Sequence, residues 1–216
     1  MKETVKHVTE TIATYDSIAK NYGVISTPEN RAWLEDSMRI FSGYMSGKKV
    51  LVAGCGEGRD SRYLRSMGFR ITSFDLSDGM LEVARSDDPN GIYLKHDLRE
   101  IGSVGRFDGI WACACLYHLT KEEFSICIND IWSSLNSGGV FFCNLKIGDG
   151  EQYIDKPRPG YPGGCEAQEK LSGRRFYSFY ELPELESIFI NFKLLKKRRD
   201  LLKEGKGAME FWLEKP

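Results

Sequence analysis

The sequence reads KVLVAGCGEGRDS over residues 49–61: an apolar run, a glycine-rich turn and the charged start of an amphipathic segment. Gly54, Gly56 and Gly58 stand at alternate positions, and their lack of a Cβ atom lets another group lie close to the backbone. The helix that follows would present free backbone N–H groups and a positive dipole end to that group. The stretch therefore predicts a buried strand, a ligand-binding turn and a helix.

Short apolar runs alternate with amphipathic segments along most of the 216 residues. This alternation is typical of a largely parallel sheet with helices on both faces. The predicted strands are residues 49–53, 70–75, 92–95, 107–113, 140–146, 192–196 and 208–213. Two pairs, Thr120 with Glu123 and Ser178 with Glu181, fit the capping box that begins helices. We expect a single α/β domain of seven strands, with an N-terminal helical cap at residues 1–45.

One segment, residues 148–174, follows neither the helical nor the strand period and is rich in glycine and proline. It is longer than the roughly 12 to 15 residues beyond which structureless loops are uncommon in compact domains. Such segments are usually functional or disordered. We interpret it as a candidate lid over an active site, the alternative being a surface insertion.

Composition narrows the class of protein. Lys and Arg total 30 against 31 Asp and Glu, so no summed charge favours a polyanionic partner. The N-terminal region lacks the apolar core of a secretory signal, and no stretch approaches the roughly 20 apolar residues of a membrane span. Cys113, Cys127 and Cys143 fall within apolar runs, which predicts buried thiols, and no zinc-like spacing is completed. We expect a cytoplasmic enzyme with no metal site and no membrane partner.

An acidic residue, Asp75, ends the second predicted strand. A carboxylate at this position can accept hydrogen bonds from both hydroxyls of a ribose, as in proteins that bind nucleoside cofactors. A nicotinamide dinucleotide would share this feature, but its turn has the pattern G-x-G-x-x-G, whereas Arg59 stands in the sixth position here. No G-K-[ST] follows the turn, which argues against a Walker phosphate loop. The pattern disfavours both dinucleotide and nucleotide-triphosphate binding.

Five motifs in order resemble those of the class I S-adenosylmethionine (SAM)-dependent methyltransferases. They are VLVAGCGEG at 50–58, DLS at 75–77, HDL at 96–98, FDGI at 107–110 with LYHL at 116–119, and LNSGGVF at 135–141. The resemblance covers nearly the whole chain. It implies a Rossmann-like α/β fold: a seven-stranded, mostly parallel sheet with helices on both faces and an antiparallel last strand. It also implies SAM as the cofactor and S-adenosylhomocysteine (SAH) as the product.

The same resemblance implies which residues bind SAM. They are Tyr15, Tyr22, Gly54, Cys55, Gly56, Gly58, Arg59, Asp75, Leu76, Met80, Asp97, Leu98 and Ala114. Within this set, Asp75 would bind the ribose and Asp97 would accept a hydrogen bond from the adenine amino group, while the two leucines would enclose the adenine. The three glycines would approach the methionine part, and Arg59 would bind its carboxylate.

Some of these residues also have purely structural interpretations. Tyr15 and Tyr22 belong to a Y-D-x-x-A-x-x-Y pattern that resembles an element closing over SAM, but their spacing also fits a packing stripe on a helix. Arg59 fits the first turn of an exposed helix, and Asp97 fits the cap of a turn. The sequence leaves these alternatives open.

The residues after the fourth strand carry the catalytic hypothesis. A sulfonium methyl is already electrophilic, so the enzyme mainly has to align a nucleophile and exclude water. The resemblance places His118 near the methyl group, where it could take a proton from a hydroxyl or ammonium acceptor, with Tyr117 as the rival for this role. The alternative is a neutral histidine that shapes the pocket or hydrogen-bonds a backbone carbonyl.

The acceptor is less determined. Residues 112–118 lack the Asn/Asp-Pro-Pro-Tyr cluster of enzymes that methylate exocyclic base amines. The basic run at 196–199 would suit RNA phosphates, but late edge strands often carry such charges to prevent edge-to-edge pairing. We expect transfer to an oxygen or nitrogen of a small molecule, such as a metabolite, a natural product or a peptide carboxylate. The alternatives are an RNA base methyltransferase and a non-catalytic SAM-binding module, and a homodimer is also considered.

Overall fold

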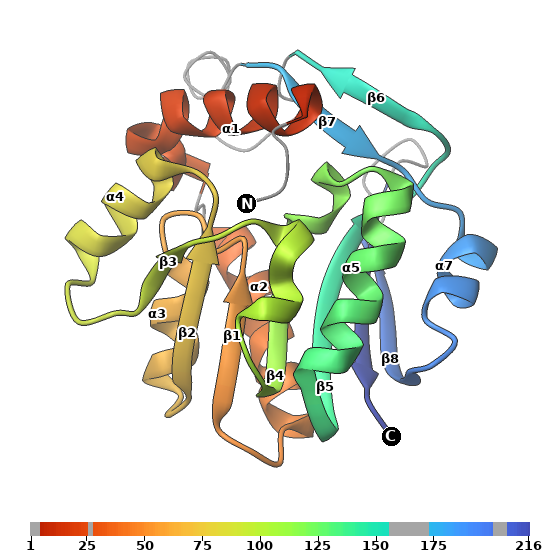
Figure 1. Cartoon of the computed structure of the whole chain (residues 1–216). Coiled ribbons are helices and arrows are strands. Elements are labelled where there is room, and N and C mark those ends of the chain that lie inside the picture. The colour runs from red at the N-terminus through yellow and green to blue at the C-terminus, as the bar shows by residue number, and fades with distance from the viewer. Residues whose placement is uncertain (1–4, 26–27, 156–172, 201–206) are drawn as a thin grey trace.

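A computed structural model describes residues 5–25, 28–155, 173–200 and 207–216. Its centre is a seven-stranded sheet in the order β3-β2-β1-β4-β5-β9-β8 (Figure 1). The strands are β1 Lys49–Ala53, β2 Arg70–Asp75, β3 Tyr93–Lys95, β4 Phe107–Ala112, β5 Leu135–Lys146, β8 Lys193–Asp200 and β9 Ala208–Glu214. β1 to β5 pair in parallel, and β9 is antiparallel to both of its neighbours. The predicted fold class, including the antiparallel last strand, is confirmed.

Helices cover both faces of this sheet. The helical elements are α1 Lys6–Ile18, η1 Ala19–Ile25, α2 Pro28–Tyr44, α3 Arg59–Ser66, α4 Asp78–Asp87, η2 Leu98–Ser103, η3 Leu116–His118, α5 Lys121–Ser134 and α7 Leu182–Ile188. Alternate residues of β1 point to opposite faces, as strand geometry requires. Val50 and Val52 pack with α2, α3 and α4, whereas Leu51 and Ala53 pack with α5 and α7. Both cores are thus anchored on the strand that leads into the glycine turn.

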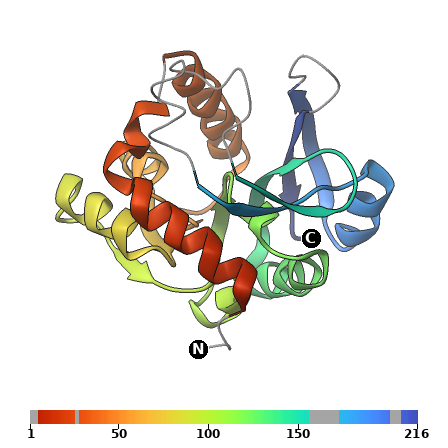
Figure 2. The same cartoon turned by 90° about the horizontal axis from the view of Figure 1, so that it is seen from above.

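A second, two-stranded antiparallel sheet joins β6 Glu151–Ile154 to β7 Arg175–Ser178. It lies beside α1 above the carboxyl ends of the central strands (Figures 1 and 2). The Thr14 hydroxyl donates to the Arg174 carbonyl at 2.6 Å, and the Phe176 N–H donates to Thr11 Oγ1 at 3.0 Å. Most of the candidate lid lies outside the described residues, so the lid stays a prediction. Its described flanks join α1 at the edge where the glycine turn lies.

Two predicted helix starts had different outcomes. The capping box of Thr120 and Glu123 is confirmed, with both reciprocal hydrogen bonds formed at the start of α5. The box of Ser178 and Glu181 is wrong, because Ser178 belongs to β7 and its hydroxyl donates to the Leu119 carbonyl at 2.6 Å. α7 begins at Leu182 without a side-chain cap. The Ser178 hydroxyl instead forms a tertiary contact, which the neighbouring residues in the sequence do not indicate.

Two strands differ from their predicted bounds by more than one residue. β5 begins at Leu135 instead of residue 140, because Leu135 pairs with Phe107 across a register shift in β4. β8 extends to Asp200 instead of 196, and this edge strand carries the basic run. The edge-strand interpretation of that run is therefore confirmed.

A buried ionic network ties α2 to the last two strands. Glu210 of β9 is fully buried and accepts a hydrogen bond from the Ser37 hydroxyl at 2.6 Å. The Arg198 guanidinium pairs with both Glu210 and Asp36, and donates to Ser37 Oγ. The Trp212 ring N–H donates to the Ser37 carbonyl. One residue of the basic run thus serves the fold.

We expect Arg198→Met to lower the free energy of unfolding by about 2 to 4 kcal/mol, because it leaves the Glu210 carboxylate buried without its cation. Lys197→Met is the matched control, since Lys197 is exposed and pairs with Glu186 at the surface. Urea unfolding followed by circular dichroism gives both values. Equal effects for the two variants would show that the network contributes no more than a surface pair.

Candidate functional site

The glycine turn after β1 adopts a backbone conformation that favours glycine. Gly54, Gly56 and Gly58 all have positive φ angles, of 62°, 54° and 81°. A Cβ atom on Gly54 would lie 2.4 Å from the Cβ of Cys115, whereas a Cβ on Gly56 would meet nothing within 4 Å. Gly54 therefore allows two chain segments to pack, and Gly56 leaves open space where a ligand can approach.

Asp75 holds this turn in place. One carboxylate oxygen accepts the N–H of Gly56 at 2.8 Å, and the other accepts the N–H of Ser77 at 2.9 Å. Burial raises the pKa of Asp75 above its usual value, and these backbone N–H groups work in the opposite direction. The carboxylate thus joins the turns that follow β1 and β2.

The N-terminal helix is attached to the same point. The carboxylate of Asp16 accepts hydrogen bonds from the Ser77 hydroxyl and from the Gly79 N–H. Ser77 is also the N-cap of α4, where its hydroxyl accepts the N–H of Met80 at 3.1 Å. Tyr15, the neighbour of Asp16, is thereby positioned beside the turn after β2.

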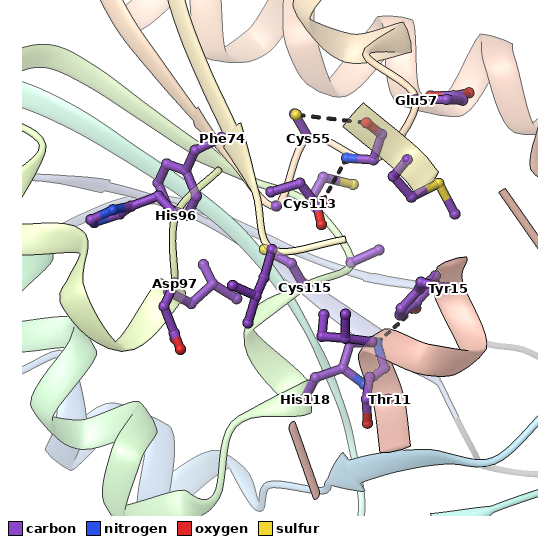
Figure 3. A pocket seen from close by; sticks show the side chains of 18 of the residues that line it. Thr11, Tyr15, Cys55, Glu57, Phe74, His96, Asp97, Cys113, Cys115 and His118 are labelled. Carbon is purple, nitrogen blue, oxygen red and sulfur yellow. Dashed lines mark hydrogen bonds between the residues drawn. The ribbon is translucent and has the colours of Figure 1, made fainter. Parts of the chain in front are cut away.

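A cavity, partly open to solvent, lies between these turns and α1. The predicted cofactor residues that line it are Tyr15, Tyr22, Gly54, Cys55, Gly56, Arg59, Asp75, Leu76, Met80, Asp97, Leu98 and Ala114. Gly58 does not line it, because it forms the N-cap of α3. Figure 3 shows Tyr15, His118, Cys115 and Asp97 around the cavity.

At one side of the cavity, Asp97 is held by Arg99. The guanidinium donates to the carboxylate through Nε and through Nη2 at 2.6 Å, and the Arg99 N–H donates to it at 2.9 Å. Burial would raise the pKa of Asp97, but these hydrogen bonds keep it below its usual value. Asp97 is also the N-cap of η2, so the capping interpretation is confirmed while the carboxylate still borders the cavity.

At the other side lies Arg59, directly after the turn. Its Nε donates to Asp60 at 2.9 Å, and its backbone N–H donates to the Glu57 carboxylate at 3.1 Å. Although burial alone would lower the pKa of Arg59, these two carboxylates raise it, so the guanidinium keeps its charge. Asp60 is itself fixed by the Trp111 ring N–H at 2.9 Å. The exposed-helix interpretation of Arg59 does not hold, because it lines the cavity.

Some lining residues were not predicted. Glu57 and Asp60 stand inside and just after the glycine turn, and that position was a signal that could have identified them. Val8, Thr11 and Ile12 line the cavity from α1, on the same helical face as Tyr15. Spacings of three, four and seven residues back from Tyr15 were the signal for this face.

Three thiols, those of Cys55, Cys113 and Cys115, also line the cavity. Burial raises the pKa of each thiol well above its usual value, so all three stay protonated. Within the described part of the chain, no group of His, Cys, Asp and Glu side chains could hold a metal ion. The thiols therefore serve as small apolar groups of the wall.

The wall opposite the glycine turn contains His118. Its Nδ1 lies 2.6 Å from the Phe176 carbonyl oxygen, which can only accept, so Nδ1 carries the proton. Nε2 then accepts the hydrogen bond from the Tyr15 hydroxyl at 2.8 Å. Burial lowers the pKa of His118 to about 3. Both ring nitrogens are committed in a neutral imidazole, as in the alternative interpretation of this residue.

Tyr117, the rival for the catalytic role, does not line the cavity. It is buried and stacks on Tyr177 of β7, with ring centroids 5.4 Å apart. Its ring also contacts that of His118 edge-on. Tyr117 therefore supports the wall from behind, and the structure gives it no position near a reacting group in the cavity.

We expect His118 to stay neutral from pH 8 to pH 5 in the folded protein. The unfolded chain takes up a proton near the usual pKa of 6.5, whereas the folded chain does so near 3, so this residue lowers stability as the pH falls below 6.5. Between pH 7 and 5, the free energy of unfolding should fall by about 1 to 2 kcal/mol more in the native protein than in His118→Gln. Urea unfolding at both pH values measures this.

The ¹⁵N chemical shifts of the His118 ring provide an independent check. They should report the Nδ1–H tautomer throughout this pH range. A titration with a midpoint near 6.5 would contradict the assignment and would restore His118 as a general base.

Comparison with known proteins agrees with this geometry. Residues 50–139 match the sequence family described as a methyltransferase domain. Malonyl-[acyl-carrier protein] O-methyltransferase of Serratia marcescens is 44% identical over 126 residues, covering 52% of this chain and 46% of that protein. The chain spans less than half the length of the curated relatives it matches.

Solved structures of low sequence identity share the fold. A 1,6-didemethyltoxoflavin-N1-methyltransferase of Burkholderia thailandensis, with bound SAH, is 19% identical, with a TM-score of 0.67 over 100% of this chain and 92% of that one. The CcbJ methyltransferase of Streptomyces caelestis is 17% identical, with a TM-score of 0.68 over 96% and 99%. Together with the family match, these structures confirm the resemblance to class I SAM-dependent methyltransferases.

Proposed function

We propose that this chain, whose central region matches the methyltransferase-domain family, transfers a methyl group from SAM to an oxygen or nitrogen of a small-molecule acceptor. One observation carries the proposal: a single cavity gathers the glycine turn with Arg59, Asp75 and Asp97 from three separate places in the sequence. The similar proteins that bind SAM or SAH and act on small molecules support it.

The residues of the cavity fit the parts of SAM. Gly56 leaves space for a ligand to approach the backbone, and the guanidinium of Arg59 can bind a carboxylate. Asp75 would accept the ribose hydroxyls, and Asp97 would accept the adenine amino group. When bound, the cofactor supplies an electrophilic methyl group.

The protein would contribute alignment and enclosure more than proton transfer. α1 lines the cavity and is joined by hydrogen bonds to Arg174 and to Phe176 of β7. Enclosure of this kind excludes water and holds a nucleophile close to the methyl group. The neutral His118 and the Tyr15 hydroxyl would shape the acceptor side, and neither is arranged as a general base.

Two other functions have less support. For RNA base methylation, the basic run at 196–199 would have to face phosphates, but Arg198 is committed to the buried network with Glu210. A non-catalytic SAM-binding module would lack a route for an acceptor, and SAH formation from SAM with any acceptor excludes it. A screen of a metabolite extract with methyl-labelled SAM distinguishes turnover from binding alone.

We also infer that the protein acts in the cytoplasm. None of the described helices combines the length and apolar character that a bilayer crossing requires. The five described cysteines are free thiols, as expected in a reducing compartment, while Cys165 lies outside the described residues. A homodimer stays a prediction, which sedimentation can test.

We expect SAH to bind and NAD not to compete with it. Asp75→Ala should weaken SAH binding by about 1 to 3 kcal/mol, because it removes a charged hydrogen-bond acceptor. Asp78→Ala is the matched control, since Asp78 is exposed and pairs with Lys95 outside the cavity. Titration calorimetry measures both. Binding of NAD without binding of SAH would refute the proposed function.

A further inference from the structure

Charged groups are distributed unevenly around the cavity. The side that contains the glycine turn and the strand ends carries four carboxylates, and its cation, Arg59, pairs with one of them, Asp60. The four are Glu57, Asp60, Asp75 and Asp97. The opposite wall, formed by Tyr15 and His118, contains uncharged rings. Charged residues that lie behind this second wall affect which acceptors can bind against it.

Arg175 stands directly behind Tyr15. Its guanidinium carbon lies 5.5 Å from the centroid of the Tyr15 ring, and the residue is buried, with 8% of its surface exposed. Burial alone would lower the pKa of Arg175, but the phenols of Tyr15, Tyr177 and Tyr22 keep it above its usual value.

A second cation, Lys146, stands at the end of β5 behind His118. Its Nζ lies 5.3 Å from the centroid of the Tyr117 ring, and that ring contacts His118 edge-on at 4.7 Å. Both Arg175 and Lys146 act on the His118 imidazole as positive charges and disfavour its protonation. The wall of Tyr15 and His118 is therefore backed by two cations, of which Arg175 is buried.

The state of His118 limits the nucleophile. An ammonium or a hydroxyl acceptor has to lose a proton to become a methylated product, and the obvious base on this wall already has both ring nitrogens engaged. A carboxylate is ionised at neutral pH and needs no base. A positive wall also favours such an anion over a protonated amine.

We propose that the acceptor is a carboxylate, which binds against the wall of Tyr15 and His118 and leaves as its methyl ester. The inference rests on the proposed function and narrows it to one chemical class. A carboxylate oxygen forms the bond to the methyl carbon as the sulfur–methyl bond breaks, and the bonding electron pair stays on sulfur. The products are a neutral ester and SAH, and no proton is transferred.

The first test measures binding to the SAH-loaded protein. The probes are malonate and succinate, and their neutral diamides serve as references. Binding is measured by titration calorimetry. We expect the dianions to bind and the diamides not to bind. Arg175→Gln should weaken malonate or succinate binding about 10-fold or more, because it removes one of the two positive charges that attract the anion. Lys146→Met is a second variant that removes the other charge without touching β7.

The chain offers a matched control for each variant. Arg174→Gln changes the neighbouring arginine, whose guanidinium stacks on Tyr153 and pairs with Glu10 at the surface. Lys121→Met removes another lysine that lies over a tyrosine ring, that of Tyr180, outside the cavity. Both controls should leave dicarboxylate binding within twofold of the native value. SAH affinity, measured on every sample, shows whether a variant is folded.

The second test identifies the bond that is formed. After incubation with methyl-labelled SAM and a metabolite extract, a methyl ester releases labelled methanol in mild alkali, whereas a methylated amine or an ether keeps its label. Release of the label supports the proposal, and retention overturns it. Failure of both dianions to bind the SAH-loaded protein, or unchanged binding in Arg175→Gln and Lys146→Met, would also overturn it. Failure of SAH itself to bind would instead refute the proposed function.

Discussion

The Asp75 carboxylate is the interaction on which the site depends. Its two oxygens each accept one backbone N–H, from Gly56 and from Ser77, and so fix the turns after β1 and β2 against each other. Ser77 in turn caps α4 and donates to Asp16, which positions Tyr15 of the N-terminal helix. Asp75, which the sequence predicts to bind a ligand, thus also connects the edge of the sheet to the helices that cover it.

The fold could be predicted because its signals are local. Each parallel strand is a short apolar run, and the turn after the first one must contain glycine, since Gly54 approaches Cys115 and Gly56 faces the cavity. The cofactor side of the cavity follows from the same turns, because carboxyl ends of parallel strands meet at one edge. Gly58 was the exception, since it shares the left-handed backbone of its neighbours but caps a helix.

The wall of Tyr15 and His118 could not be predicted in this way, because distant segments build it through backbone groups. His118 is held by the backbone carbonyl of Phe176. Every residue type has such a carbonyl, so the sequence does not indicate this contact. Within the described residues, β6 and β7 are short strands of four residues each that pair with each other and not with the central sheet. Arg175 looked like any charged residue near a glycine-rich segment, and its importance lies in its burial beside three tyrosines. The glycine turn and the strand ends can thus be identified from sequence motifs, whereas the wall of Tyr15 and His118 depends on tertiary contacts.

The position of β9 has a consequence for how the chain folds. This strand follows β8 in the chain, yet it lies between β5 and β8, and its Trp212 and Phe211 belong to the cores on opposite faces of the sheet. Until it is synthesised, β5 has an open edge beside the buried residues Val140, Phe141 and Phe142. Long-range pairings of this kind form slowly, and unpaired apolar edges attract other chains. Until β9 pairs with it, the apolar edge of β5 is therefore open to contact with other chains.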